Sequence, residues 1–427
     1  MTAVVVGGGL AGLLAGHRLA QQGRRVTVLE ATTRLGGMLA PVEIGRVAVD
    51  AGAEAYAVRG GVGRALCEEL GLEVAGPVGQ PHIWRPNGVW PMAEGVLGIP
   101  SSLDDPALGA LTPEDLARLR QDAHLPREVG ADAVTVGELV RARLGHGALD
   151  TLVAPVAQGV YSLAPDRMPL AAFAPGLTHA LRETGTLLGA VAAVRRPGVA
   201  AVEQPVGGMF RLVDALAERI VAAGGEIRLT SPAVSLRRAG SQFAVGLPEG
   251  ETVVADRLVL AATAATACAL LARIGVDLTP PPVATARLAV LGVAHPALAS
   301  GPVGSGLLVG ERDDAIHAKA LTHYSLKWPW ARRPGQEILR LAYPEQLLPT
   351  RAEALGDASR FLGIPLADRD VTGFASVSWE SMPTRMEHST REYYLEAVTA
   401  AGVDLVGAWL DGNGIASVIA GCDRLTR

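Results

Sequence analysis

The sequence predicts a mixed α/β protein in which one parallel-sheet domain is assembled from three separated segments. The chain opens on a short apolar strand that runs into a glycine-rich turn and a helix. Residues 205–275 return to alternating helix and strand patterns, and about the last 25 residues contain a further strand, DLVGAW at 404–409, followed by a glycine turn and a helix start. A chain of 427 residues is also too long for one ordinary core, so we expect the intervening segments to form further lobes.

The first segment carries a dinucleotide-binding fingerprint. Residues 3–6 read AVVV, a fully apolar strand typical of a buried parallel sheet. The next residues, GGGLAG, place glycines at Gly7, Gly9 and Gly12 before a helical stretch, and a second strand, RRVTVLE, ends at Glu30. Because strand, turn, helix, strand and terminal acid occur in order, the segment predicts a Rossmann-like unit.

Each glycine has a mechanical role in such a unit. Gly7 permits the tight turn, Gly9 lets a pyrophosphate approach the backbone, and Gly12 lets the helix pack close to the sheet. The first N–H groups of the helix, at Leu10 and Ala11, would then point at the phosphates. Glu30 would accept hydrogen bonds from the ribose hydroxyls; the alternative is a glycine-rich turn with an unrelated surface glutamate.

Composition excludes several classes of function. The net charge is −5 with no long run of one sign, so we expect no nucleic-acid partner. Lys319 and Lys327 are the only lysines, which reflects either codon bias or a use of arginine for carboxylate recognition. Isolated cysteines at Cys67, Cys268 and Cys422 and histidines without metal spacing predict neither a redox dithiol nor a metal site.

The chain shows no targeting or membrane segment. The first strand begins by residue 3, which leaves no room for a signal peptide. The longest uncharged apolar stretch, 258–272, has 15 residues, whereas a membrane span needs about 20. We interpret it as a strand followed by a helix, and we expect a soluble protein of a reducing compartment, the cytoplasm, with peripheral membrane contact left open.

The residues after Glu30 extend the binding loop along a longer cofactor. Arg34 and the pair Gly36-Gly37 follow the acid, and VDAGAEAY follows at 49–56. This pattern resembles the flavin amine oxidase superfamily, in which the second segment passes beside the isoalloxazine ring. The resemblance implies that FAD is the cofactor.

A second nucleotide fingerprint is not visible in the sequence. The nearest pattern, GPVGSGLLVG at 301–310, lacks the third glycine and a following helix. We therefore expect no NAD(P)H domain. An organic substrate then supplies the electrons, and molecular oxygen is the default acceptor.

Nearly the whole chain resembles flavin-dependent coproporphyrinogen III and protoporphyrinogen IX oxidases. The likeness is carried by segments at 85–102, 136–145, 155–170, 207–216, 324–330 and 407–415. The segment at 155–170 reads PVAQGVYSLAPDRMPL, and the last one reads GAWLDGNGI. The resemblance implies an FAD-binding domain of residues 1–60, 203–280 and 375–427. It further implies a β-sheet substrate-binding domain of residues 61–95 and 281–374 and a helical cap lobe of residues 96–202.

The fingerprint and the resemblance together nominate a set of FAD-binding residues. They are Gly7, Gly9, Leu10, Ala11, Gly12, Glu30, Ala31, Arg34, Gly36, Gly37, Met38, Gly52, Ala53, Glu54, Val234, Ala262, Trp379, Gly407, Gly414 and Ile415. In the closing motif, a helix that begins at Ile415 would direct its N-terminus at the flavin and stabilise negative charge on the reduced ring. The alternative is an ordinary connection between a strand and a helix.

The resemblance implies aromatisation of a porphyrinogen, with six electrons leaving in three two-electron steps. Propionates on such a tetrapyrrole call for basic groups at the rim of an apolar cavity, and the candidates are Arg59, Arg85, Arg340 and Lys327. Lys327 is also the candidate catalytic residue, as a lysine near the flavin that positions water or oxygen; the alternative is a surface lysine on a β-strand beside Trp328. Tyr161 would stack on the macrocycle or simply pack.

The sequence differs from the family pattern at several positions near the expected substrate face. Leu410, Asn413 and Ala416 replace the usual residues of the closing motif, and the segment 382–385 replaces a Leu-Pro-Gln-Tyr-like stretch. A flavin oxidase or desaturase for an amine or another metabolite therefore stays an alternative, although Trp409 alone could contribute to the aromatic cage of an amine oxidase. A flavin-binding protein without turnover is a further alternative, and either a monomer or a homodimer fits.

Overall fold

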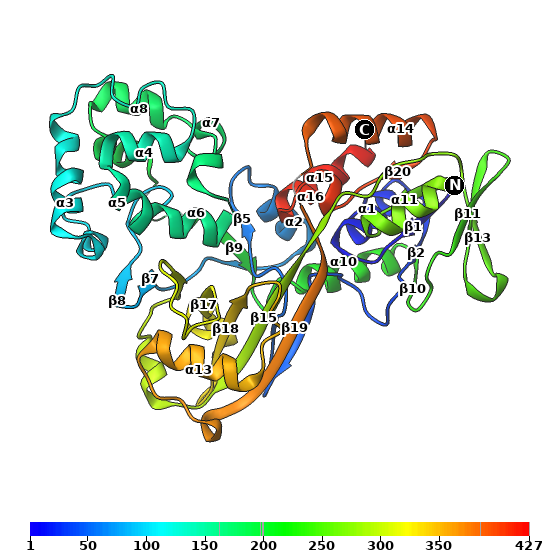
Figure 1. Ribbon diagram of the computed structural model, residues 1–427. Coiled ribbons are helices and arrows are strands. Elements are labelled where there is room, and N and C mark those ends of the chain that lie inside the picture. Colours follow the sequence, from blue (N-terminus) through cyan, green and yellow to red (C-terminus); the bar gives the residue numbers. More distant parts are fainter. Residues whose placement is uncertain (162, 197, 199, 385, 427) are drawn as a thin grey trace. The chain divides into compact units, whose positions relative to one another are not determined.

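The computed structural model describes residues 1–427 except 162, 197, 199, 385 and 427. The chain forms two compact units (Figure 1). The first contains Met1–Pro77, Ala200–Arg287 and Val377–Arg427, and the second contains Val78–Val199 and Leu288–Ser376. Within the replaced stretch 382–385, Arg385 lies outside the described residues.

A five-stranded parallel sheet forms the centre of the first unit. Its order is β10-β2-β1-β14-β20, so strands from all three segments of the unit lie side by side. The strands are β1 (Thr2–Val6), β2 (Arg25–Leu29), β10 (Glu226–Arg228), β14 (Arg257–Leu260) and β20 (Asp404–Leu405). Because β1 lies between two parallel neighbours, its residues Val4, Val5 and Val6 are almost completely buried.

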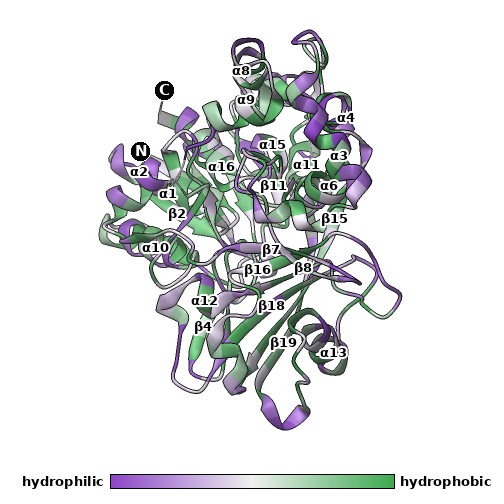
Figure 2. Ribbon diagram, turned by 90° about the vertical axis from the view of Figure 1, so that its left-hand side faces the viewer, coloured by the Kyte–Doolittle hydropathy of each residue, from purple (hydrophilic) through white to green (hydrophobic). Residues whose placement is uncertain are grey.

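Helices cover one face of this sheet, and a small antiparallel sheet with two helices covers the other. The helices of the first face share one core with Val5 and Val259; they are α1 (Leu10–Gln21), α2 (Val62–Leu70), α10 (Arg211–Ala222) and α16 (Ile415–Cys422). The second face shares a core with Val4 and Leu260; its elements are β11 (Ser235–Ala239), β12 (Gln242–Gly246), β13 (Thr252–Ala255), α11 (Ala264–Ala272) and α14 (His388–Ala400). Helices α1 and α11 are largely hydrophobic in Figure 2, as their burial requires.

The closing segment folds differently from the expected strand DLVGAW. Only Asp404 and Leu405 form β20, and the short helix α15 (Ala408–Asp411) follows at once. Gly407 has a φ of 139°, which turns the chain out of the strand, and its N–H donates to the carboxylate of Asp411 at 3.0 Å. The side-chain cap therefore winds residues 408–411 into a helical turn instead of extending the sheet.

A seven-stranded sheet forms one layer of the second unit. Its order is β19-β15-β18-β17-β16-β7-β8. The strands are β7 (Pro81–Arg85), β8 (Gly88–Pro91), β15 (Val283–Val293), β16 (Gly306–Val309), β17 (Ala320–His323), β18 (Glu337–Tyr343) and β19 (Val371–Pro383). Of β15 and β19, residues 288–293 and 371–376 belong to this unit. Helix α13 (Arg351–Leu362) packs on this sheet through Ala354, Ala358 and Phe361.

Helices build the remainder of the second unit, where the sequence predicts a helical cap. They are α3 (Pro113–Arg120), α4 (Val136–Leu144), α5 (His146–Ala148), α6 (Ala154–Tyr161), α7 (Leu170–Phe173), α8 (Leu177–Thr184) and α9 (Leu187–Val194). Their apolar faces form one separate core. The shorter elements of the chain are β3 (Pro41–Ile44), β4 (Val47–Asp50), β5 (Tyr56–Ala57), β6 (Val74–Ala75), β9 (Val202–Pro205) and α12 (Tyr324–Lys327).

The two units divide the chain less finely than the three domains predicted from the sequence. Apart from residues 375 and 376, the predicted FAD-binding segments lie in the first unit. Residues 61–77, which the prediction assigns to the substrate-binding domain, also lie there, because α2 packs in the core with α1. The helical cap and the large sheet together form the second unit, so their separation into two domains stays a prediction. No helix within the described residues is both long and apolar enough to cross a membrane.

A buried ion pair joins the helices of the second unit. The Arg143 guanidinium is fully buried, and its Nε donates to the carboxylate of Asp122 at 2.6 Å. Its other nitrogens donate to the carbonyl oxygens of Asp122, Pro126 and Gly185. The second carboxylate oxygen of Asp122 accepts the N–H of Leu187 at 2.7 Å, at the start of α9. Each charge therefore has partners that satisfy it away from water.

We expect Arg143→Met to destabilise the helical region by about 3–5 kcal/mol, because it leaves the Asp122 carboxylate buried without its cation. Hydrogen exchange of α4, α8 and α9, measured peptide by peptide, should accelerate strongly. Arg182→Met, at an exposed position in the same region, is the matched control and should change the exchange little. Unchanged protection in Arg143→Met would contradict the stabilising role of the pair.

Candidate cofactor site

The turn between β1 and α1 has the shape that the fingerprint predicts. Gly7 has a φ of 110°, and a Cβ built on it would lie 2.6 Å from the carbonyl oxygen of Ala261. A Cβ on Gly12 would lie only 1.8 Å from the carbonyl oxygen of Gly7. Both positions therefore require glycine, because helix α1 starts in direct contact with the end of β1 and the neighbouring β14.

Gly9, the middle glycine, differs from the other two because space lies next to it. A Cβ on Gly9 would meet no heavy atom within 4 Å. Gly9 is the N-cap of α1 and gives the helix no side-chain cap, and no hydrogen bond among the described residues uses the N–H of Leu10 or Ala11. Open space beside unused N–H groups at a helix N-terminus is the cradle that a pyrophosphate fits.

Glu30 lies at the carboxyl end of β2, beside this turn. One carboxylate oxygen accepts the N–H of Gly8 at 2.7 Å, and the other accepts the N–H and the hydroxyl of Thr32, each at 2.8 Å. Ala31, between Glu30 and Thr32 in the sequence, is exposed. The acid is thus fixed at the edge of the glycine turn, where a ribose attached to the pyrophosphate would lie. Thr32 was not nominated from the sequence, because the fingerprint ends at the acid and contains no position two residues after it.

Arg34 holds the next loop by its guanidinium. Nη1 of Arg34 donates to the carbonyl oxygens of Gly37 at 2.8 Å and Leu35 at 3.2 Å. The guanidinium carbon lies 5.4 Å from the ring centroid of Trp379, and the indole N–H of Trp379 donates to the carbonyl oxygen of Ala51 at 2.8 Å. This cation–π contact joins two predicted FAD residues that lie 345 positions apart in the chain.

The segment VDAGAEAY approaches the Gly36-Gly37 loop closely. A Cβ on Gly52 would lie 1.8 Å from the carbonyl oxygen of Met38, so this position also requires glycine. The N–H of Gly36 donates to the carbonyl oxygen of Gly8 at 2.8 Å, which ties the loop back to the turn after β1. Ala53 and Glu54 continue from Gly52 as a partly buried stretch.

Asp50 at the start of that segment has a structural role that the sequence did not reveal. Its side chain is almost completely buried and accepts the N–H of Met209 at 2.8 Å, within GGMFRLVDAL. The contact anchors the segment to the loop before α10. No spacing rule relates residue 50 to residue 209, so only the fold shows this connection.

The remaining predicted FAD residues also lie in the first unit. Ala262 follows β14, and its carbonyl oxygen accepts the indole N–H of Trp409 at 3.1 Å. Gly407 follows β20, and Gly414 and Ile415 begin α16, whose N-cap has no side-chain hydrogen bond. Val234, 53% exposed, lies just before β11. Their contact with FAD stays a prediction.

The substrate candidates differ in their surroundings. Arg59 is an exposed residue of the first unit, in the turn before α2. In the second unit, Arg85 donates to Glu311 at 2.6 Å and to Thr151 at 3.1 Å, so its guanidinium already has partners. Arg340 lies on β18 with 8% of its surface exposed.

Tyr161 lies at the end of α6, 43% exposed, and its ring meets Phe173 edge to face at 5.3 Å. This position combines an exposed ring with an aromatic neighbour, as a stacking surface would require.

Lys327 lies in a helical turn, not on the surface of a β-strand as the structural alternative supposed. It ends α12, and its ammonium lies 5.3 Å from the ring centroid of Trp328. A buried network holds the same turn: the Ser325 hydroxyl donates to the Glu337 carboxylate at 2.5 Å and accepts the N–H of Ile338 at 2.9 Å.

Glu337 is the charged centre of this network. Burial on its own would raise the pKa of the Glu337 carboxyl, but hydrogen bonds from His323 and Ser325 and the charge of Arg332 outweigh it and lower that pKa. Glu337 is therefore ionised at neutral pH and stabilises the turn that carries Lys327.

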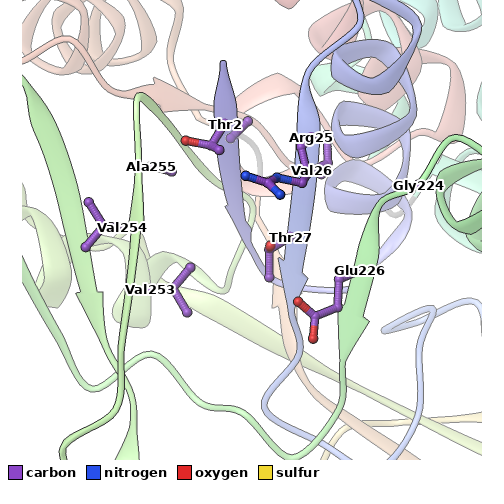
Figure 3. A pocket seen from close by; sticks show the side chains of 10 residues that line it. Thr2, Arg25, Val26, Thr27, Gly224, Glu226, Val253, Val254 and Ala255 are labelled. Atoms are coloured by element: carbon purple, nitrogen blue, oxygen red, sulfur yellow. The ribbon is translucent and has the colours of Figure 1, made fainter.

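A separate hollow in the first unit does not belong to this site. Figure 3 shows Thr2, Arg25 and Glu226 lining it together with residues of β13, and its volume is about 330 Å³. These residues lie at the amino ends of β1, β2 and β10, whereas the glycine turn follows the carboxyl end of β1. Ligands of parallel sheets bind outside the carboxyl ends of the strands, so we do not assign the cofactor to this hollow. Within the described part of the chain, no group of acidic, cysteine or histidine side chains could hold a metal ion.

Comparison with known proteins decides the family. The profile of the flavin containing amine oxidoreductases matches residues 10–292. The chain belongs to this family. Coproporphyrinogen III oxidase of Mycobacterium tuberculosis is 31% identical over 98% of this chain and 95% of its own length. The Bacillus subtilis protein of the same name is 24% identical, over 97% and 95%.

Among solved structures, a putative protoporphyrinogen oxidase from Exiguobacterium has the same fold. Its TM-score is 0.83, with 23% identity, and the match covers 100% of this chain and 97% of that one. The chain is therefore an FAD-dependent oxidoreductase of mixed α/β fold. This confirms the cofactor and the family resemblance predicted from the sequence. FAD supplies the redox chemistry when bound, and the open glycine turn and its unused N–H groups fit the pyrophosphate.

The glycine geometry generates a direct prediction for cofactor binding. Gly9→Ala should leave the unfolding of the apoprotein unchanged, because its Cβ has open space, but should weaken FAD binding by about 1–2 kcal/mol, because the Cβ intrudes on the pyrophosphate. Titration of the apoprotein with FAD and thermal unfolding without FAD measure the two effects.

Two further variants serve as references for this measurement. Gly12→Ala should destabilise the apoprotein by at least about 2 kcal/mol, because its Cβ collides with a backbone oxygen. Gly356→Ala, in α13 with nothing near its Cβ, should alter neither FAD binding nor, beyond a small helix-propensity gain, stability. Equal FAD affinity of Gly9→Ala and the unaltered protein would reject the placement of the pyrophosphate.

Proposed function

We propose that the enzyme oxidises coproporphyrinogen III to coproporphyrin III, in heme biosynthesis. The observation that carries this proposal is the similarity to mycobacterial coproporphyrinogen III oxidase, which extends over 98% of the chain. The cofactor cradle of the first unit supports it, since the reaction needs a two-electron acceptor. Protoporphyrinogen IX, the substrate class in the name of the Exiguobacterium structure, is the second candidate.

The proposed reaction removes six electrons and six protons from the macrocycle in three equal steps. Of the six hydrogens, four come from meso carbons and two from pyrrole nitrogens: three would leave meso carbons as hydrides to a bound flavin, and three would leave as protons, two from nitrogen and one from the fourth meso carbon. Three molecules of oxygen accept the electrons and become three molecules of hydrogen peroxide. The bound flavin supplies the hydride chemistry, so the polypeptide needs no nucleophilic triad.

The residues of the chain would then bind and orient. Gly9 and the first turn of α1 hold the pyrophosphate, Glu30 holds the ribose, and Arg34 fixes the loop beside them. Arg59 is a candidate partner for a propionate because its guanidinium is exposed. Arg85 is a less accessible candidate since Glu311 and Thr151 already engage it.

The roles of the other candidates follow the same logic. Arg340 and Tyr161 are proposed to meet a propionate and the macrocycle, and Lys327 to position water or oxygen. A protein of this function would work in the cytoplasm as a monomer or homodimer, with peripheral membrane contact as an open alternative.

Amine oxidation is the competing function within the family, and one observation disfavours it. Trp409 is the residue that the sequence offers for the aromatic cage of an amine oxidase. Trp409 is 5% exposed, packs in the core with Val4 and Leu260, and donates to the carbonyl oxygen of Ala262. Its ring is therefore committed to the core of the first unit.

Anaerobic mixing with candidate substrates tests the proposal. Coproporphyrinogen III should bleach the visible flavin absorbance faster than protoporphyrinogen IX, and putrescine should leave it unchanged. Air should then restore the absorbance with release of hydrogen peroxide. A flavin that neither porphyrinogen bleaches would reject the porphyrinogen assignment, and a faster response to putrescine would favour amine oxidation.

Arg59→Gln should raise the KM for coproporphyrinogen III about three- to ten-fold with little change in kcat, because it removes one charge-assisted hydrogen bond to a propionate. Steady-state kinetics at several salt concentrations measure this effect. Arg46→Gln, at an exposed turn of the same unit between β3 and β4, is the matched control and should leave KM unchanged. Equal KM values for the two variants would remove Arg59 from the substrate site.

A further inference from the structure

A buried carboxylate organises the closing turn of the first unit. The side chain of Asp411 is 1% exposed. One of its oxygens accepts the N–H of Gly407 at 3.0 Å. The other accepts Nη2 of Arg391 at 3.2 Å and Nη1 of Arg424 at 2.6 Å. A buried carboxylate with one backbone and two guanidinium partners is fully satisfied and fixes all the groups that it binds.

The two arginines extend this hub to other elements. Nε of Arg391, on α14, donates to the carbonyl oxygen of Leu410 at 3.0 Å. Nη2 of Arg424, after α16, lies 3.4 Å from the carbonyl oxygen of Leu405 on β20. The hub therefore joins the end of the sheet, the closing turn, helix α14 and the segment after α16.

Helix α16 accommodates the hub and touches the helix of the nucleotide fingerprint. A Cβ on Gly421 would lie 2.3 Å from the carboxylate carbon of Asp411, so this position must be glycine. The next residue, Cys422, lies with its sulfur 3.4 Å from the carbonyl oxygen of Ala11, in the first turn of α1. The position of α16 is thus fixed by Asp411 at one side and by α1 at the other.

The amino end of α16 has N–H groups available for a ligand. Its N-cap is Gly414, which offers no side-chain acceptor, and within the described residues no hydrogen bond uses the N–H of Ile415 or Ala416. Gly407, Gly414 and Ile415 are all predicted FAD residues. The hub binds this segment directly at Gly407.

We propose that Asp411, with Arg391 and Arg424, is a positioning residue for the flavin, because it fixes the turn whose N–H groups meet the ring. This inference rests on the proposed cofactor role of Gly407, Gly414 and Ile415, and it is independent of the porphyrinogen assignment. N–H groups of a helix start stabilise the anionic reduced flavin more than the oxidised form. Precise placement of the turn therefore raises the midpoint potential of the flavin as well as its affinity.

Charge and position predict different outcomes, which two substitutions separate. The hub contains one carboxylate and two guanidinium groups. Asp411→Asn removes a negative charge, which by electrostatics alone would raise the potential of a nearby flavin; Arg424→Gln removes a positive charge and would lower it. Loss of positioning lowers the potential in both variants.

The experiment uses the full chain reconstituted with FAD and needs no porphyrinogen. Apoprotein is titrated with FAD by the quenching of flavin fluorescence, and the midpoint potential is measured by equilibration with reference dyes. We expect both Asp411→Asn and Arg424→Gln to weaken FAD binding about ten-fold and to lower the potential. If Asp411→Asn does not fold, Arg391→Lys replaces it: a lysine keeps the positive charge but cannot reproduce both the bond to Leu410 and the bond to Asp411, so a lower potential would report lost positioning and not lost charge.

Asp404→Asn is the matched control. Asp404 begins β20, and its carboxylate accepts Nε of Arg257 at 2.6 Å; Arg257 in turn donates to the carbonyl oxygen of Leu425. The control therefore breaks an ion pair whose arginine, like Arg424 of the hub, contacts another segment of the unit. This pair lies at the amino end of β20, whereas the hub binds the turn after its carboxyl end. It should leave affinity and potential unchanged.

Three results would overturn the proposal. A higher potential in Asp411→Asn would show a charge effect without positioning. Unaltered affinity and potential in both hub variants would show a purely structural role. Equal losses in Asp404→Asn would show that any weakened ion pair of this unit disturbs the cofactor. Absence of porphyrinogen oxidation by the unaltered enzyme would reject only the substrate assignment.

Discussion

The close approach of helix α1 to the end of β1 is the constraint on which the first unit depends. A side chain at Gly12 would collide with the carbonyl oxygen of Gly7, so the helix can start this close to the sheet only without one. That contact places Gly9 at the rim with open space beside it, and leaves the first N–H groups of α1 available. Packing of the core and a turn whose open space and unused N–H groups fit phosphates are therefore consequences of one backbone geometry.

Local signals in the sequence were sufficient for this part of the site. The apolar strand, the three glycines and Glu30 lie within 30 residues, and their order and spacing alone mark the turn, although Gly7 also approaches the distant Ala261. The alternation of strands and helices likewise predicted that distant segments share one sheet, which the order β10-β2-β1-β14-β20 shows. The predicted strand at 404–409 was too long because a side-chain cap on Gly407, which strand propensity does not include, winds the chain into α15.

Contacts between distant segments could not be read from the sequence. Asp50 binds the N–H of Met209, and Arg34 lies over Trp379, although 159 and 345 positions separate the partners. In the sequence Asp50 looks like any solvated charge, and only the fold buries it; nothing near Arg34 in the sequence marks Trp379 as its partner. The same limit applies to the predicted substrate residues. Arg85 was nominated as a basic residue in a family segment, and the structure shows that its guanidinium donates to the Glu311 carboxylate.

Buried carboxylates recur wherever separate segments must be held in register. Asp50 in the first unit and Asp122 in the second accept N–H groups from distant parts of the chain, and Asp122 also pairs with Arg143. Asp411 accepts the nearby N–H of Gly407 and joins other elements through Arg391 and Arg424. A carboxylate serves this purpose because it can accept several hydrogen bonds at once, and because leaving any of them unmade in a buried place is costly. In a domain assembled from three segments, short loops connect only neighbours in sequence, as at the turn between β1 and α1, and other contacts must join the segments to one another. The buried carboxylates are such contacts, and on our proposal Asp411 thereby sets the position of a flavin-binding turn without touching the flavin.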